Sequence, residues 1–556
     1  MKPKTFIVEN KRRSANYKPN IWSYDYIESL TSKYTEAAYQ RQIEKLKTEF
    51  AHIFDQARGV NKLRLIESIN NLCLSSLFEK EIKGTLDALQ FDVDGLEGLK
   101  DDLEATALYF KLLRQHSYDV SQDIFINFID NKGAFKESLR TNIRGVLQLY
   151  EASHLAIQEE NIMNEAKDFS KESLRNLDLD MDVSISKQVI DALEHPLHWT
   201  AQWFRVRRQI DAYEHQVDRN PILLELAKLN FNVVQAIHQR ELQELSRWWR
   251  NLGLMHEINF SRDRLIESFL CTTGVAFEPH YACLRKCLTK VICFTLIIDD
   301  LYDIYGSLEE LDCFTRAMYR WNSKEIEHLP KSMKLCFSAL QDTMNEVAQA
   351  IHKEQCWNGI LSFVEKAWAD VCKAFLLEAR WFNEGFTPSL EEYLKSAWIS
   401  STCPLISLIT HLIEEEGPYE ELLDKLEQKK NLIYYSSLIF KLWNDLSTSD
   451  VELERGDAPS SIFCYMREAN VSEDTARGHI RGLIINAWNN INKELIERFS
   501  KHQRSANLII SAARVSHFLY CNGDGIGVQD CQTKQLIQNL LIEPVAISYN
   551  DHINGI

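Results

Sequence analysis

Glycine and proline are scarce in this chain, which has 19 glycines and 11 prolines in 556 residues. Both residues favour turns, so their scarcity disfavours a protein made of many short strands and tight hairpins. Alternating apolar and polar runs are also few, whereas helical periodicity recurs along the chain. The sequence therefore predicts an all-α protein. A chain of this length exceeds one hydrophobic core, so two or three domains are expected.

Positive charge is in short supply as well. The chain has 63 Lys and Arg against 80 Asp and Glu, which gives a net charge of −17 at pH 7. This balance disfavours a nucleic-acid partner and an anionic membrane surface. No apolar run approaches the roughly 18–20 residues of a membrane span, so no membrane insertion is expected.

The N-terminal segment lacks the apolar core of a secretory signal, and it is too short for a Ser/Arg-rich transit peptide. Two compartments stay open. The protein is cytoplasmic if Met1 is the native start, and it belongs to an organelle if a transit segment has been removed.

The cysteines form no repeated frame. The chain has 13 of them without a Cys-x-x-Cys pair, which is typical of reduced core residues rather than of a disulfide scaffold. Cys283 with Cys287, and Cys271 with Cys293, are interpreted as core packing rather than as zinc ligands, because no histidine lies beside them at finger spacing.

Three segments are predicted along the chain. Residues 1–25 are polar, contain Pro19 and Trp22, and are predicted to form an arm. Residues 26–220 hold successive amphipathic stretches and are predicted to form an N-terminal helical domain. Asn220 and Pro221 interrupt this pattern, so residues 221–556 are predicted to form a second helical domain.

Two clusters of oxygen-bearing side chains lie in the second domain. Asp299 and Asp303 are four residues apart, and Asn444, Thr448 and Glu452 follow at the same spacing. On an α-helix each set lines one face. Oxygen ligands without sulfur or imidazole suit Mg²⁺ or Mn²⁺, which are commonly shared with substrate phosphates. The two clusters therefore predict a metal-dependent enzyme that handles a diphosphate.

The alternative is that these side chains only solvate helix faces. The preceding residues favour metal binding, because 291–298 and most of 432–440 are apolar and indicate buried helices. A carboxylate on a buried helix is costly unless something positive pairs with it.

A third acidic cluster is interpreted differently. Asp178, Asp180 and Asp182 alternate with apolar residues, which indicates a solvated loop, and the glycine and distal Glu of a calcium-binding loop are missing. An Asp-x-Asp-Asp arrangement, which could act as a strong acid, occurs nowhere in the chain. Its absence argues against cyclisation started by protonation.

Arg262 and Arg264 precede the first metal cluster, and two guanidiniums there can clamp an anion. With these arginines, the chain resembles the plant class I terpene synthases over nearly its whole length. Arg12 and Arg13, separated from Trp22 by eight residues, resemble the pattern of the angiosperm branch dominated by monoterpene synthases. The residues that carry the resemblance are Arg12, Arg13, Trp22, Arg262, Arg264, Asp299, Asp300, Asp303, Asn444, Asp445, Thr448, Glu452, Tyr520, Gly523, Asp524 and Gly525.

The resemblance implies a catalytically silent N-terminal α-barrel and a C-terminal α-bundle that holds the active site. It implies a monomer that takes a small-molecule prenyl diphosphate and three Mg²⁺ ions, with Mn²⁺ as a possible substitute. The arm with Arg12, Arg13 and Trp22 would cover the mouth of the site. The organelle, if there is one, would be the plastid.

The resemblance also implies roles for individual residues. Two metal ions would bind Asp299 and Asp303, and a third would bind Asn444, Thr448 and Glu452. Arg262 and Arg264 would be catalytic with Tyr520 and Asp524, and the diphosphate would be bound by Arg262, Asp299, Asp303, Lys441 and Asn444. Four aromatic residues are candidates to stabilise a carbocation: Phe294, Tyr434, Phe440 and Tyr520.

Two positions depart from the family pattern. Lys441 stands where the family usually has arginine, which removes a bidentate fork. Cys271 stands where tryptophan is common, which implies a reshaped cavity. The predicted substrate is geranyl diphosphate, with monoterpene products. Farnesyl diphosphate is the alternative, and a catalytically silent helical scaffold is a remote one.

Overall fold

The computed structural model describes Arg12, Ala15 and residues 17–91, 99–177, 183–258, 260–355, 359–455, 459–499 and 503–547. Arg13 and the cluster of Asp178, Asp180 and Asp182 lie outside the described residues. Within the described ranges the chain is helical without a strand, apart from an isolated bridge between Ile129 and Phe135. The predicted all-α class is confirmed.

The first part of the chain forms short and medium helices. These are α1 (Tyr24–Ser29), α2 (Ala37–Gln56), α3 (Gly59–Asn71), α4 (Glu79–Phe91), α5 (Leu103–Gln115), α6 (Ile143–Ser153), α7 (Asn161–Arg175), α8 (Val183–Glu194) and α9 (Gln202–Glu214).

The second part contains the longer helices. These are α10 (Pro221–Leu252), α11 (Leu254–Glu257), α12 (Leu265–Val275), α13 (Ala282–Asp300), α14 (Leu308–Arg320), α15 (Lys331–Gln355), α16 (Ile360–Glu384), α17 (Leu390–Ser400), α18 (Cys403–Glu414), α19 (Tyr419–Gln428), α20 (Lys430–Arg455), α21 (Ser461–Ala469), α22 (Glu473–Arg498), α23 (Gln503–Tyr520) and α24 (Cys531–Ile537). Within the described ranges, two π-helical turns occur, at Leu301–Tyr305 and Gln538–Ile542.

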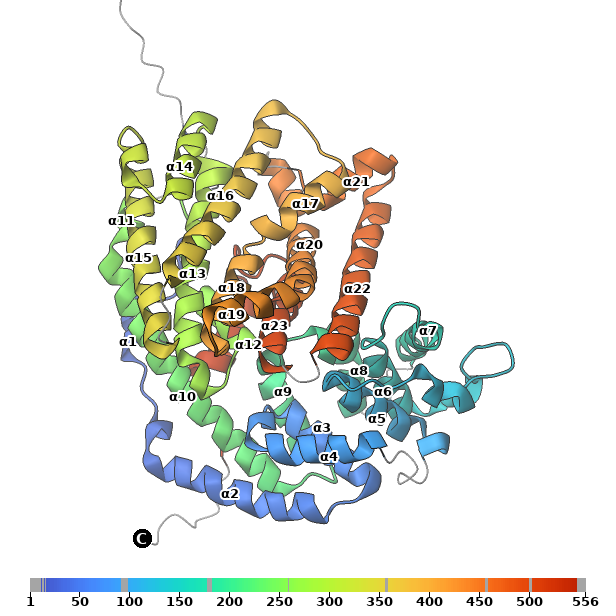
Figure 1. The fold of residues 1–556 in the computed structure, drawn as a ribbon. Coiled ribbons are helices and arrows are strands. Elements are labelled where there is room, and N and C mark those ends of the chain that lie inside the picture. The colour runs from blue at the N-terminus through green and yellow to red at the C-terminus, as the bar shows by residue number, and fades with distance from the viewer. Residues whose placement is uncertain are drawn as a thin grey trace, which may run out of the picture.

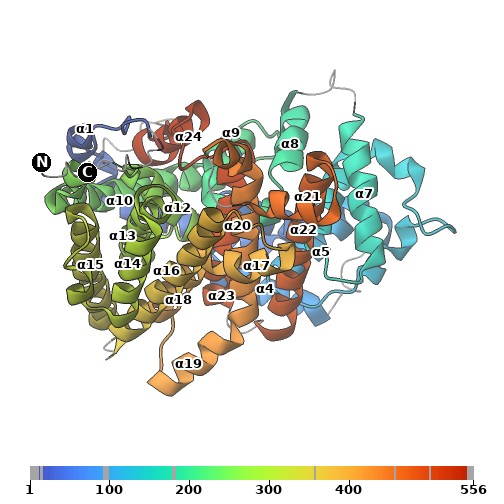
Figure 2. The same cartoon turned by 90° about the horizontal axis from the view of Figure 1, so that it is seen from above.

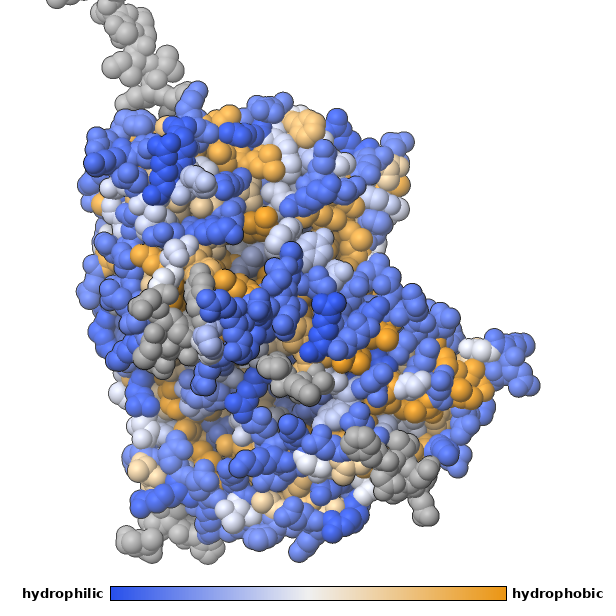
Figure 3. All heavy atoms as spheres, viewed as in Figure 1, coloured by the Kyte–Doolittle hydropathy of each residue, from blue (hydrophilic) through white to orange (hydrophobic). Residues whose placement is uncertain are grey.

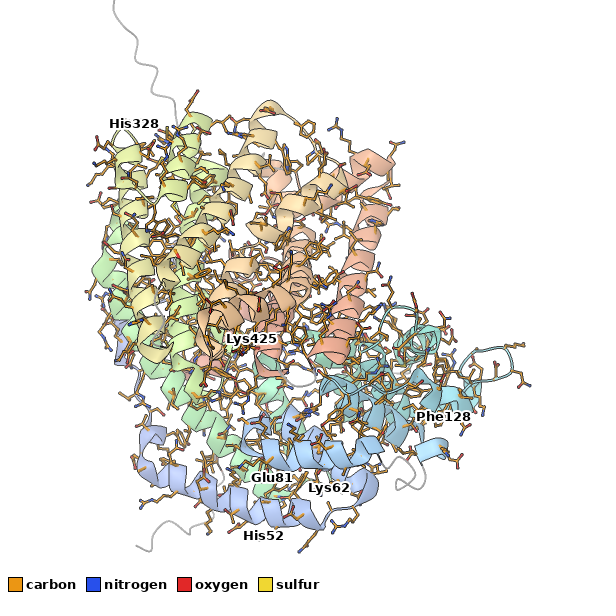
Figure 4. The ribbon with its side chains drawn as sticks, in the orientation of Figure 1. His52, Lys62, Glu81, Phe128, His328 and Lys425 are labelled. Carbon is orange, nitrogen blue, oxygen red and sulfur yellow. The ribbon has the colours of Figure 1, made fainter. Side chains whose placement is uncertain are left out.

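The two parts lie side by side. In Figure 1 the helices α2–α8 occupy the lower and right-hand side, and the bundle from α12 to α23 stands above them. Figure 2 shows the molecule from above, with α13, α14 and α15 of the bundle at one end and α7 of the N-terminal part at the other. Polar side chains cover most of the face in Figure 3, and the apolar patches on it are separate from one another. In Figure 4 the labelled His52, on α2, and His328 lie at opposite ends of the molecule.

Helix α10 begins where the sequence pattern pauses. The Asn220 side chain accepts a hydrogen bond from the Leu223 backbone N–H at 3.0 Å, and Pro221 occupies the first turn, where its missing N–H costs nothing. The helix ends at its C-cap residue Gly253, which adopts the left-handed backbone conformation with a φ of 62°. α10 packs against α1 and α2 and also against α12 and α13, so the division into domains at residue 220 stays a prediction.

The two helices that carry the acidic clusters are core helices, as predicted. Along α13, Val291, Phe294 and Ile298 are completely buried, and on α20 the same holds for Leu432 and Ile439. α18 packs against both α13 and α20. The two helices that carry the motifs are therefore joined through a shared neighbour in the apolar core.

One segment differs from the expectation that no apolar run is long enough to cross a membrane. The 25 residues Leu390–Glu414 are long and apolar enough to cross a membrane, by length and composition alone, with a mean hydropathy of 1.3 in their most apolar window. However, 72% of this window is buried inside the protein, and Thr402, with φ 60°, divides the run into α17 and α18. The segment has the features of a core element of the bundle.

Candidate active site

The first acidic cluster lies at the end of α13. Asp299 is in the last turn of the helix, and its side chain is 32% exposed. Asp303 lies in the π-helical turn Leu301–Tyr305 that follows, and it is half-buried. Such turns are often found at functional sites, because the wider turn re-aims the side chains.

The second cluster lies along α20. Asn444 and Glu452 are half-buried, and Thr448 is buried with its hydroxyl donating to the Asn444 carbonyl at 2.9 Å. This bond uses the hydroxyl proton and leaves oxygen lone pairs available to a metal ion. Among the described residues, no three His, Cys, Asp or Glu side chains are gathered to hold a metal ion. Each cluster therefore presents an incomplete set of carboxylates.

Glu378, on α16, connects the two clusters electrostatically. Burial raises the pKa of its carboxyl group, the charge of Lys441 lowers it, and the charges of Asp445 and Asp299 raise it further. Charges from both helices therefore act on this one carboxyl group. Glu378 is 8% exposed, and its Oε1 atom has no hydrogen-bond partner within the described structure.

Arg262 contacts the first cluster directly. Its Nη2 atom donates to Asp299 Oδ2 at 2.5 Å, and its backbone N–H donates to Asp300 Oδ2 at 3.0 Å. Burial lowers the pKa of the guanidinium, but the carboxylates of Asp300 and Asp299 outweigh it and raise the pKa well above its usual value. The arginine is therefore a fixed cation at the edge of the site.

Arg264 has a different environment. The residue is 2% exposed, and its guanidinium donates to the carbonyls of Ile526 and Gly527, both at 3.2 Å. These bonds tie the start of α12 to the loop that follows α23. In this structure Arg264 holds that loop, whereas Arg262 reaches the acidic cluster.

The same loop contains Asp524. Its Oδ1 atom accepts hydrogen bonds from the backbone N–H groups of Ile526 at 3.2 Å and Gly527 at 2.8 Å. Tyr520 is buried at the end of α23. Burial raises the pKa of its hydroxyl, the charges of Asp524 and Asp299 raise it further, and that of Arg262 lowers it. Tyr520 therefore lies close to the predicted catalytic groups.

The four candidate aromatic residues do not form one wall. The rings of Phe440 and Tyr520 meet edge to face with their centroids 5.7 Å apart. Tyr434 instead packs against Trp398, at 5.5 Å, in a separate apolar cluster, and Phe294 is completely buried in the core. The structure thus brings two of the four together.

Two carboxylates that were not predicted as functional residues have well-defined environments. Asp300 and Asp445 each follow the first ligand of a cluster, and both are completely buried. Asp300 accepts hydrogen bonds from Tyr17 and from Ser261, both at 2.8 Å, and Asp445 accepts one from the Tyr393 hydroxyl, which lies 2.8 Å from Oδ2 and 3.0 Å from Oδ1. Their position one residue after a ligand, about 100° around the helix, is a sequence signal for a role away from the metal face.

Glu378 was also not predicted. It lies in the apolar stretch of residues 374–382, so it carries the same signal, an acid on a buried helix, that selected Asp299.

The N-terminal arm lies over this region. Arg12 forms a bidentate pair with Glu310, with its Nη2 atom 2.7 Å from Oε1, and its guanidinium lies 4.2 Å from the ring centroid of Tyr305. Trp22 Nε1 donates to Glu267 at 3.0 Å. The arm therefore contacts the π-helical turn that contains Asp303 as well as helix α12.

Comparison with known proteins identifies two family domains along the chain. Residues 21–193 match the terpene synthase N-terminal domain, and residues 250–490 match the metal binding domain of the terpene synthase family. The chain is 48% identical to the (E,E)-alpha-farnesene synthase of Malus domestica, over 98% of this chain and 96% of that protein. It is 46% identical to the alpha-farnesene synthase of Ricinus communis, over 97% and 96%. Identity to the chloroplastic alpha-thujene synthase of Litsea cubeba is 43%, over 96% and 92%.

Solved structures agree with these matches. The isoprene synthase from grey poplar, in complex with three Mg²⁺ ions and dimethylallyl-S-thiolodiphosphate, superposes with a TM-score of 0.87 at 39% identity, covering 95% of this chain and 99% of that one. A limonene synthase with 2-fluorolinalyl diphosphate gives a TM-score of 0.91 at 35% identity, covering 96% and 100%. With matches over nearly its whole length in both sequence and structure, the chain belongs to the plant terpene synthase family, whose members are lyases that act on prenyl diphosphates.

Proposed function

We propose that this chain is a magnesium-dependent class I terpene synthase that ionises an allylic prenyl diphosphate and releases inorganic diphosphate. The proposal is supported by the two sets of oxygen ligands on the buried helices α13 and α20, and by Glu378, which lies in a region where its pKa responds to the charge of Asp299 on one helix and to those of Lys441 and Asp445 on the other. Arg262 adds a fixed cation at the edge of that region.

The donor set fits Mg²⁺. Asp299, Asp303, Asn444, Thr448 and Glu452 all offer oxygen, and Asp299 keeps 32% of its side chain exposed while paired with a cation. We assign Asp299 and Asp303 to two ions and the other three residues to a third. Bound Mg²⁺ supplies Lewis-acid stabilisation of the diphosphate as the allylic C–O bond breaks.

The chain's own cations complete the binding of the leaving group. Asp300 accepts a hydrogen bond from the Arg262 backbone N–H, which fixes the position from which the guanidinium, beside Asp299, can contact a diphosphate oxygen. Lys441 offers a point charge from the opposite helix. Fixed cations of this kind stabilise the charge that develops on the leaving group without reorganisation. The ring faces of Phe440 and Tyr520 can stabilise a carbocation by about 0.5–2 kcal/mol each.

Two substrate lengths are proposed. Geranyl diphosphate is the substrate predicted from the sequence. Farnesyl diphosphate is favoured by the higher identity to two farnesene synthases, 48% and 46%, than to the alpha-thujene synthase, 43%. The small Cys271 side chain, close enough to Tyr520 to raise the pKa of its hydroxyl, also favours the longer chain, because it leaves more room than tryptophan. We therefore place farnesyl diphosphate first and geranyl diphosphate second.

The decisive experiment is a matched pair of incubations of the purified protein with Mg²⁺, one with each substrate, followed by gas chromatography and mass spectrometry. Faster formation of 15-carbon products supports farnesyl diphosphate, and faster formation of 10-carbon products supports geranyl diphosphate. A folded protein that releases no diphosphate from either substrate would overturn the proposed function.

The compartment depends on the substrate, and the assembly on where the ligands come from. We propose a plastid location if geranyl diphosphate is preferred, as the chloroplastic name of one relative suggests, and a cytoplasmic one otherwise. We propose a monomer, because each predicted ligand comes from this one chain. Size-exclusion chromatography with light scattering tests the assembly.

A further inference from the structure

Asp445 stands beside a proposed metal ligand, yet it is completely enclosed. Its Oδ2 atom accepts hydrogen bonds from the Tyr393 hydroxyl at 2.8 Å and from the Ser461 backbone N–H at 3.0 Å. Its Oδ1 atom lies 3.0 Å from the Tyr393 hydroxyl and 3.3 Å from Lys441 Nζ. Both oxygens are engaged, so the carboxylate cannot turn outward to bind a metal ion without breaking these contacts.

The contacts come from three helices. Lys441 and Asp445 lie one turn apart on α20, Tyr393 is on α17, and Ser461 begins α21. Lys441 Nζ also lies 6.0 Å from the centroid of the Tyr393 ring. Tyr393 is 2% exposed, so its hydroxyl has a fixed position from which to orient the carboxylate.

Lys441 can still reach a ligand. Its side chain is 17% exposed, and an ammonium group has three N–H donors, of which the contact with Asp445 uses one. A lysine side chain loses more conformational freedom for each hydrogen bond to a phosphate than an arginine side chain does, because the planar guanidinium already holds its donors in place. A lysine at this position therefore gains more from a partner that holds it in place.

We propose that Tyr393 and Asp445 are positioning residues, which hold the Lys441 ammonium where it binds the diphosphate group and fix the first turn of α21 beside it. The proposal rests on the proposed function, since it assigns a supporting pair to one cation of that site. It gives Asp445 a role that does not involve metal binding, although the residue lies next to Asn444.

The test measures binding of inorganic diphosphate in the presence of excess Mg²⁺ by isothermal titration calorimetry. Tyr393→Phe removes only the hydroxyl and is expected to weaken binding by about fivefold to tenfold. Asp445→Asn keeps the shape and removes the charge, and it is expected to weaken binding at least as much. If Tyr393→Phe does not fold, Asp445→Asn decides the question alone.

A double-mutant cycle separates positioning from general stabilisation. If Tyr393 acts through Lys441, Tyr393→Phe has no further effect on diphosphate affinity in a Lys441→Met background. Independent losses that multiply in the double variant would overturn the proposal. Tyr109→Phe is the matched control, because Tyr109 is also 2% exposed and its hydroxyl bonds a backbone carbonyl in the N-terminal part.

The outcomes distinguish the two levels of inference. If the wild-type protein does not bind Mg²⁺ and diphosphate, the proposed function fails, and this proposal fails with it. If the wild type binds and Tyr393→Phe binds equally well, only the positioning role is overturned. Steady-state kinetics with the preferred substrate should show the loss chiefly in KM for Tyr393→Phe.

Discussion

The Tyr17 hydroxyl donates a hydrogen bond to Asp300 Oδ1 at 2.8 Å, across 283 positions of the chain. Asp300 in turn holds the backbone of Arg262, whose guanidinium lies 5.2 Å from the centroid of the Tyr17 ring. The N-terminal arm is thereby tied both to the helix that ends at Asp299 and to the cation that pairs with it. The arm and the first acidic cluster form one connected unit.

Replacing Tyr17 by Phe is expected to lower kcat by about tenfold to a hundredfold. The change keeps the ring over Arg262 and removes one hydrogen bond to a buried charge, which contributes about 1.5–3 kcal/mol. At about 1.4 kcal/mol per tenfold, that range gives the expected loss. Steady-state kinetics with the preferred substrate is the measurement.

Tyr26→Phe is the control for this prediction, because Tyr26 is 48% exposed on α1. It should leave kcat unchanged. Wild-type kcat for Tyr17→Phe would show that the arm does not influence Arg262.

Asp299→Ala is expected to reduce turnover by at least about a thousandfold while the circular dichroism spectrum stays that of the wild type. The substitution removes one of the proposed ligands and leaves Arg262 paired with Asp300, so metal binding rather than folding is affected. Glu452→Ala should behave in the same way. Activity is measured over a Mg²⁺ titration.

Two controls belong to this experiment. Asp370→Ala removes a surface carboxylate that pairs with Lys373 at 3.6 Å and should have no effect. The triple alanine variant of Asp178, Asp180 and Asp182 should also remain active. A well-folded but inactive triple variant would show that the active site has been assigned to the wrong domain.

The predictions from sequence succeeded where a local pattern carries the information. Helical spacing and apolar context gave the all-α class and the buried helices beneath Asp299 and Asn444, because both follow from periodicity within one helix. The start of α10 at Pro221 follows from local backbone chemistry in the same way.

Long-range contacts could not be predicted in this way. The spacing of Arg262 and Arg264 suggests two equivalent cations, but the loop after α23 captures Arg264 through its carbonyls. Asp300 and Asp445 acquire their environments from Tyr17 and Tyr393, which are distant in the sequence. Such contacts depend on how helices pack, and periodicity within one helix does not contain that information.

Acid should destabilise the protein between pH 6.5 and 4. His195, His198 and His517 are buried, and burial lowers their pKa values to about 4, about 3 and about 4. Because these values lie below that of an unfolded histidine, the unfolded chain binds more protons in this window. Stability is full above pH 6.5 and is lost as the pH falls, by about 2 kcal/mol per histidine at pH 5.

Urea unfolding at pH 7.5 and pH 5.0 measures this effect. His517→Gln should reduce the difference between the two pH values, because glutamine can still donate to the Glu194 carbonyl that His517 contacts at 3.0 Å but does not titrate. His215→Gln, at an exposed position, should leave the difference unchanged. An equal pH dependence in wild type and His517→Gln would contradict the assignment.

Gly527→Ala should disrupt the loop that holds Arg264. A Cβ atom at this position would lie 1.9 Å from Asp524 Oδ2 and 2.9 Å from Asp524 Cγ, so the carboxylate must move. That movement breaks its bonds to the backbone of Ile526 and Gly527, whose carbonyls in turn bind Arg264. We expect kcat to fall by about tenfold, since Arg264 and Tyr520 both lose a fixed neighbour.

Gly478→Ala is the control, because a Cβ there meets nothing within 4 Å on helix α22. It should leave kcat unchanged while stabilising the helix by about 0.5–1 kcal/mol. Wild-type kcat for Gly527→Ala would show that the position of this loop is not important for turnover.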